Sequence, residues 1–272
     1  MAENDDLNDL GPKLREAERR LAQHPGYQEY VLLLSFERSL TNVFISNWNE
    51  LLGLLEQVAT NPVLALEMIQ NVRPPEVRDQ FQAAITQRLH NYVAGTMTLV
   101  EHSRRVMGKR SGAICNDFAK RKQELLTNPE IPFMQDLRNF TLHRSLPFLG
   151  HSLSVVNVNA PDQAMTSEVQ LSVSELLESD GWTAPSRGFL EAQGDVVTLR
   201  PLVRKHGRLT LEINMWLHDA LASANAEALA DANRLVIERN AILTGADLSD
   251  AERLTRQWTE MRSSEVQRET PP

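Results

Sequence analysis

Residues 136–147, DLRNFTLHRSLP, bring an arginine, an asparagine and a histidine together as Arg138, Asn139 and His143. On a helix, Asn139 and His143 lie one turn apart on the same face. A histidine changes charge near neutral pH and can take or give a proton, and a guanidinium can bind a phosphate through two hydrogen bonds. Only RNA carries the 2′-hydroxyl that can attack the neighbouring phosphate. These residue types therefore suit the cleavage of RNA without a metal ion.

The spacing of the arginine and the histidine is not distinctive by itself. An arginine followed five to seven residues later by a histidine occurs four times in the sequence: Arg19/His24, Arg138/His143, Arg144/His151 and Arg200/His206. The 138/143 pair differs because an asparagine directly follows its arginine and because Pro132 and Pro147 bound a short predicted helix. The alternative interpretation is that Arg138 and His143 make structural hydrogen bonds at a helix interface.

The motif resembles the signature of HEPN domains, in which an arginine, a polar residue, three more residues and a histidine lie on a late helix of a helical bundle. The resemblance covers about residues 27–150. It implies that Arg138 and His143 are the catalytic pair of an endoribonuclease of the toxin, defence or stress type, and that Asn139 orients them or contacts the substrate. It also implies a homodimer in which both motifs line one cleft, although some members of this family are catalytically silent binding modules.

Three other residues are candidates for a supporting role. Glu101 and His102 lie on the predicted long helix that precedes the motif, where they either form solvated surface or face the cleft and tune His143. Arg144 directly follows His143 and is the third candidate.

The charge distribution is uneven along the chain. The whole chain has a formal net charge of −8, which argues against a general-purpose nucleic-acid binder. Residues 88–144, however, contain ten Lys or Arg and five Asp or Glu, a net charge of +5. These cations either belong to solvated helix faces or form a local surface for a phosphate backbone.

Several common kinds of site lack their motifs in this sequence. It has no GxxxxGK[ST] phosphate loop, no GxGxxG, no GxSxG and no HExxH, and Cys115 is its single cysteine. We therefore expect neither a cofactor nor a metal. No apolar run approaches the roughly 20 residues that cross a bilayer, and the acidic start MAENDDLNDL lacks a signal-peptide pattern, so a cytoplasmic protein without a membrane span is expected.

Apolar residues recur mostly three and four positions apart, which predicts a mainly α fold. We expect a bundle of long antiparallel helices with one inserted β-hairpin at about 151–173. The predicted helices span about 13–24, 27–59 with a bend near Ser35, 62–72, 76–107, 113–127, 132–146 and 201–243 with a break near Gly207, and a last helix starts at Ser249 or Asp250. Residues 1–12 and the tail RETPP are expected to be loose, and 178–198 an irregular connector. The organisation expected is a helical bundle at 1–150 followed by the hairpin and C-terminal helices at 151–272.

Two other functions compete with RNA cleavage. The first is a non-enzymatic helical interaction or regulatory module whose acidic remainder binds a basic protein. The second, a small-molecule enzyme with a pocket between bundle and hairpin, has no nucleophile or cofactor motif behind it. If the protein is a toxin-like ribonuclease, an antitoxin or another regulatory protein is a further expected partner.

Overall fold

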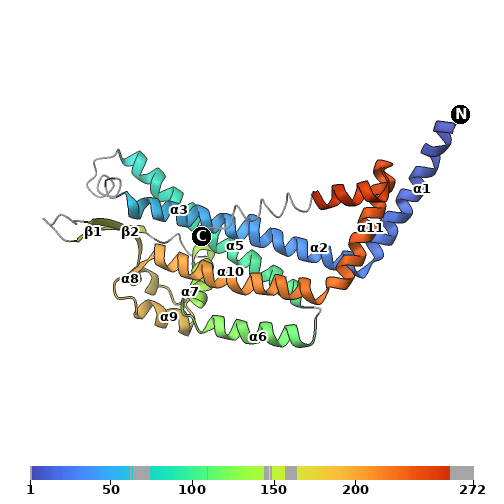
Figure 1. The fold of residues 1–272 in the computed structure, drawn as a ribbon. Coiled ribbons are helices and arrows are strands. Elements are labelled where there is room, and N and C mark those ends of the chain that lie inside the picture. The colour runs from blue at the N-terminus through green and yellow to red at the C-terminus, as the bar shows by residue number, and fades with distance from the viewer. Residues whose placement is uncertain are drawn as a thin grey trace. The chain divides into compact units, whose positions relative to one another are not determined.

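The computed structural model describes residues 2–61, 63, 74–108, 110–143, 147, 149–156 and 164–257 (Figure 1). In this described part the fold is mainly α, with one three-stranded antiparallel sheet. The predicted fold class, a helical protein with an inserted hairpin, is confirmed.

The helices and strands follow one another in a simple order. The α-helices are α1 (Ala2–Gln23), α2 (Pro25–Arg38), α3 (Ser46–Thr60), α5 (Pro75–Met107), α6 (Ala113–Leu126), α7 (Glu130–His143), α8 (Val173–Leu177), α9 (Ala184–Glu191), α10 (Leu199–Ala224) and α11 (Ala226–Thr244). A π-helix, η1 (Ser39–Ile45), stands between α2 and α3, and residues 248–257 are helical. The strands are β1 (Leu149–Val156), β2 (Ala164–Ser172) and β3 (Val196–Thr198).

The chain forms two compact units. Unit 1 consists of Met1–Thr41, His102–Arg110 and Met215–Pro272, and unit 2 consists of Asn42–Glu101 and Ser111–Asn214. Each unit draws residues from both sides of position 150. The division into residues 1–150 and 151–272 stays a prediction.

Unit 1 is built on the packing of α1 and α2 against α11. Gly26 allows α2 to approach α11 closely, because a Cβ at this position would overlap the backbone of Ala228. Glu29 on α2 accepts hydrogen bonds from Arg110 and from Asn225, the latter at 3.3 Å. Both members of the Arg110–Glu29 ion pair are mostly buried, so solvent screens this pair less than the exposed ion pairs of this unit.

Unit 2 has an aromatic core between α3, α5 and α10. Phe44 stacks on Trp48 at a centroid distance of 6.2 Å, and Tyr92 on α5 lies 6.0 Å from Phe44. The indole Nε1 of Trp48 donates to the carbonyl of Val203 on α10 at 3.1 Å. Gly207 packs against the same indole, and a Cβ there would overlap its ring. Because glycine has no side chain, position 207 allows α10 to pack directly against Trp48 on α3.

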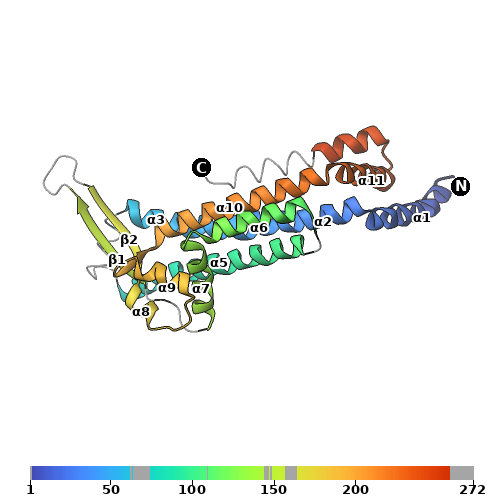
Figure 2. The same cartoon turned by 90° about the horizontal axis from the view of Figure 1, so that it is seen from below.

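The sheet has the strand order β1-β2-β3, and both pairings are antiparallel. Figure 2 shows β1 and β2 as a long hairpin. Val169 and Leu171 on β2 are buried, whereas Glu168 and Gln170 point to the other face and are half-buried. This alternation is typical of an antiparallel sheet that covers a core on one side only. The hydroxyl of buried Ser167 donates to the carbonyl of Val58 at 2.5 Å, which satisfies a free carbonyl in the last turn of α3.

Several predicted elements agree closely with the structure. The expected hairpin at 151–173 is β1 and β2, and the predicted helices 76–107 and 113–127 are α5 and α6. The predicted helix 27–59 is present as α2, η1 and α3, and the change of helix type begins at Ser39 rather than near Ser35. The predicted helix at 62–72, apart from residue 63, and the tail RETPP lie outside the described residues.

Other predictions were wrong. The predicted helix 201–243 breaks at Asn225 and not at Gly207, because Gly207 serves a close contact inside α10. The expected connector at 178–198 contains α9 and β3, since Pro185 occupies the first turn of α9, where a proline starts a helix rather than breaking one. The helix expected from Lys13 begins at Ala2, and the last helix begins at residue 248, where the Asp247 side chain accepts from the Asp250 amide at 2.9 Å.

The contact at Gly207 predicts a large effect of one methyl group. Gly207→Ala should lower the free energy of unfolding by about 1–3 kcal/mol, the usual cost of overfilling a core, although alanine favours helices. Gly53→Ala in α3 is the matched control, because nothing lies within 4 Å of a Cβ there, and it should raise stability by about 1 kcal/mol. Urea unfolding measures both. Equal effects of the two substitutions would contradict the close contact.

Candidate functional site

The candidate motif lies on α7 in unit 2, and buried aromatic contacts fix this helix. Phe133 and Leu137 have no exposed surface. Phe133 lies 5.5 Å from Trp182 and 4.7 Å from Phe189 between ring centroids, and Phe140 also stacks on Trp182 at 5.5 Å. One face of α7 is therefore committed to the core.

Asp136 adds a polar anchor to this packing. Its Oδ2 atom accepts hydrogen bonds from the backbone amide and the hydroxyl of Thr183, at 2.9 and 2.6 Å, and from the hydroxyl of Ser186 at 2.6 Å. Thr183 is the N-cap residue of α9, so the carboxylate also lies at the positive end of that helix. These contacts hold α7 in one rotation against α9.

Arg138 and Asn139 follow on the adjoining face of α7. Arg138 is half-buried and Asn139 is exposed. The Nη1 atom of Arg138 donates to Oδ1 of Asn139 at 3.1 Å. Arg138 Nε and Glu130 Oε2 are the two buried side-chain atoms without a hydrogen-bond partner among the described residues. The structure thus brings Arg138 and Asn139 together, with the Nε atom of the guanidinium buried.

The structure describes the other residues of the predicted site only in part. The backbone of His143 ends α7, but its side chain and all of Arg144 lie outside the described residues. Glu101 is exposed and belongs to unit 2, whereas His102 is half-buried and belongs to unit 1. The catalytic role of His143 and the supporting roles of Glu101, His102 and Arg144 stay predictions.

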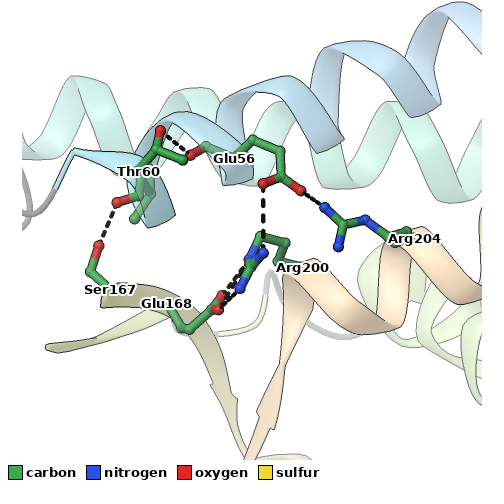
Figure 3. Close-up of polar contacts among 7 residues, drawn as sticks. Glu56, Thr60, Ser167, Glu168, Arg200 and Arg204 are labelled. Carbon is green, nitrogen blue, oxygen red and sulfur yellow. Dashed lines mark hydrogen bonds and ion pairs between the residues drawn. The ribbon is translucent and has the colours of Figure 1, made fainter. Parts of the chain in front are cut away.

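The Arg200/His206 pair, which has a similar spacing, does not form one site. Arg200 on α10 is a centre of ion pairs: its Nε donates to Glu168 at 3.0 Å, and its Nη1 lies 3.6 Å from Glu56 (Figure 3). Glu56 also pairs with Arg204. The hydrogen bond with Glu168, more than any other contact, raises the pKa of Arg200. This network ties α3, β2 and α10 together, and its two cations and two anions balance.

His206 instead faces the core. It is 1% exposed, and its Nδ1 atom lies 2.5 Å from the hydroxyl of the fully buried Tyr92. Burial raises the pKa of Tyr92 well above its usual range, so the phenol keeps its proton, and the imidazole tautomer sets which of the two groups donates in this hydrogen bond. Burial lowers the pKa of His206 to about 3. The imidazole is therefore neutral near pH 7, and its role is structural.

A cavity in unit 1 is the feature that sequence reasoning missed. It measures about 800 Å³ and lies between α2, α11 and the helix at 248–257. Its lining is mainly apolar and includes Tyr27, Tyr30, Leu34, Val236 and Leu254. The residues at 27, 30 and 34 follow a helical spacing that also suits ordinary core packing, so the sequence offered no separate signal for a cavity.

The residues that the structure describes contain neither a metal site nor a membrane-spanning helix. No group of three or more His, Cys, Asp or Glu side chains there could hold a metal ion. No helix in that part of the chain is long and apolar enough to span a bilayer.

Comparisons with known proteins add no relative. No protein-family model matches the sequence, and no curated protein or solved structure is significantly similar to it. The physical evidence for a function therefore comes from α7 and its surroundings.

The buried His206 predicts how stability changes with pH. Between its ordinary pKa of 6.5 and about 3, the unfolded chain binds a proton that the folded protein does not bind. The free energy of unfolding should therefore fall as pH decreases below 6.5, with His206 contributing about 1.4 kcal/mol per pH unit. His206→Gln, which keeps a hydrogen-bonding group beside Tyr92, should show a shallower fall in urea titrations between pH 6.5 and 4.5. Equal slopes in the two proteins would contradict a buried neutral imidazole.

The Asp136 anchor predicts a second stability effect. Asp136→Asn replaces a charged acceptor of three hydrogen bonds and should lower the free energy of unfolding by about 1–3 kcal/mol. Asp117→Asn on α6 removes the same charge at an exposed position and should change stability by less than about 0.5 kcal/mol. Urea unfolding at pH 7 compares the two variants. If Asp136→Asn leaves the free energy of unfolding unchanged, the hydrogen bonds of Asp136 do not hold α7.

Proposed function

We propose that this protein is a metal-independent endoribonuclease of the HEPN-like kind, with Arg138, Asn139 and His143 as its catalytic residues. The main support is the way in which the guanidinium of Arg138 is held on α7. Its guanidinium is held by Asn139 while its buried Nε has no partner among the described residues. A half-exposed guanidinium that a neighbouring side chain holds in place can bind a phosphate oxygen through its terminal N–H groups.

The proposed reaction uses RNA as its own nucleophile. His143 takes the proton of a 2′-hydroxyl, the 2′-oxygen attacks the adjacent phosphorus, and the bond to the 5′-oxygen breaks. The products are a 2′,3′-cyclic phosphate and a 5′-hydroxyl, whose oxygen takes a proton from water as it leaves. Arg138 stabilises the negative charge that builds on the phosphate oxygens, and Asn139 holds the guanidinium in place.

The sequence setting supports the same proposal. Residues 88–144, which contain the motif, carry a net charge of +5 in a chain of net charge −8. The resemblance to HEPN domains implies a homodimer whose two motifs line one cleft, acting on cytoplasmic RNA. A toxin, defence or stress role would also imply an antitoxin or another regulatory protein.

Cleavage of RNA in the presence of EDTA tests this function. The wild-type protein should cut mixed cellular RNA, and Arg138→Ala and His143→Ala should each reduce the rate at least about 100-fold, the size expected for the loss of a proton-transfer or charge-stabilising group. Arg187→Ala is the control, since Arg187 is an exposed arginine on α9 paired with Glu191, and it should cut at the wild-type rate. No cutting by the wild-type protein, or equal cutting by all four proteins, would exclude the proposed reaction.

The second candidate function is a non-enzymatic interaction module. The apolar cavity of about 800 Å³ in unit 1 favours it, because apolar cavities of this size bind ligands or side chains of a partner. It predicts that His143→Ala alters stability or partner binding and leaves RNA unchanged. The RNA assay and the thermal stability of the same variants therefore separate the two functions.

A further inference from the structure

Strand β1 is an edge of the sheet in unit 2. It pairs with β2 over its whole length, from Leu149 opposite Leu171 to Val156 opposite Ala164. No other described residue forms a β-ladder with it, and none makes a hydrogen bond to its second edge. In an antiparallel pair, alternate residues direct their N–H and C=O groups away from the partner strand. About half of the backbone groups of β1 therefore face outward along an eight-residue edge.

The sequence of β1 lacks the residues that normally prevent edge strands from pairing. Its sequence, LGHSLSVV, contains no proline and no Lys, Arg, Asp or Glu. Natural edge strands are usually short or bulged, or carry proline or inward-pointing charges, because an unprotected edge is a template for another strand. His151 is the one titratable residue of β1, and its ring lies 6.0 Å from that of Phe81 on α5. It therefore contacts the helices rather than guarding the edge.

The two faces of β1 differ in a way that fixes how a new strand can add. Leu149 is buried and belongs to the face that carries His151 and Leu153, whereas Gly150, Ser152 and Ser154 lie on the opposite face. A strand that extends the sheet must bring an apolar face next to the first set and small or polar groups next to the second. β1 itself has this pattern.

We propose that β1 pairs antiparallel with β1 of a second copy of this chain, so that two three-stranded sheets become one six-stranded sheet. A two-fold axis perpendicular to the sheet keeps the faces matched, because directly opposed residues of antiparallel strands share a face. With the axis at Ser152, that serine faces its own copy and His151 faces the partner's Leu153. No like charges are opposed in this register, because β1 carries no charged side chain apart from His151.

This interface does not rest on the proposed nuclease activity. It follows from the backbone of β1 and would hold for an interaction module equally well. It does supply a physical basis for a dimer that is independent of any family resemblance.

The test is the oligomeric state of the full chain, measured by analytical ultracentrifugation between 1 and 200 µM (concentrations chosen to span typical dimer affinities, about 10⁻⁶ to 10⁻⁴ M). The wild-type protein should reach twice the chain mass of 30.7 kDa. Ser152→Lys/Ser154→Lys should stay monomeric, because lysines then oppose one another in registers centred on either residue. Thr166→Lys/Gln170→Lys is the matched control: it adds the same charges to the same face of the neighbouring strand β2 and should still dimerise.

A charge-reversal experiment tests the pairing itself. Ser152→Glu/Ser154→Glu should also be monomeric, and an equimolar mixture of the lysine and glutamate variants should form a heterodimer. Amide exchange measured by NMR should show that the outward-facing amides of β1 are protected in the wild-type dimer and exchange at least about tenfold faster in the lysine variant. Circular dichroism verifies that each variant is folded. A wild-type monomer at 200 µM, or a lysine variant that dimerises as well as the wild type, overturns the proposal.

Discussion

The approach of α10 to α3 at Gly207 is the contact on which much of unit 2 depends. Gly207 packs on the indole of Trp48, whose Nε1 donates to Val203 one turn earlier on α10. Once this register is set, Arg200 and Arg204 occupy the turns that face Glu56, and His206 faces Tyr92. A residue with any side chain at position 207 would move the two helices apart and weaken both polar clusters together.

On α7, one face packs in the core and the other face carries the residues of the motif. Asp136 and Leu137 turn inward, one to the N-terminus of α9 and the other to the apolar core. Arg138 and Asn139 come next in the chain and lie outside that core, and they bond to each other. A rigid helix with a paired Arg–Asn on its outer side is the kind of scaffold that phosphate chemistry requires, since positioning and charge stabilisation do most of the work. The proposed function depends on this division of faces.

The sequence predicted the elements whose periodicity is long and regular, and failed where single residues have context-dependent effects. α5 and α6 and the β1–β2 hairpin follow from apolar spacing alone. Gly207 and Pro185 misled the prediction for a shared physical reason: glycine can serve close packing as well as a helix break, and proline starts helices as well as stopping them. For the site, the sequence identified Arg138 and Asn139 as neighbours on one helix. It did not indicate the anchor at Asp136, because its partners Thr183 and Ser186 are more than forty residues away in the chain.

Attack by the 2′-hydroxyl is the step that distinguishes the proposed reaction of Arg138 and His143 from other ways of cutting RNA. The most direct measurement uses a short RNA that the protein cuts at one mapped position, compared with the same RNA carrying a single 2′-deoxy nucleotide there, both in EDTA. We expect products ending in a 2′,3′-cyclic phosphate and a 5′-hydroxyl from the first RNA, and no cutting at the deoxy position of the second. Cutting at the deoxy position, or products with a 5′-phosphate, would contradict it.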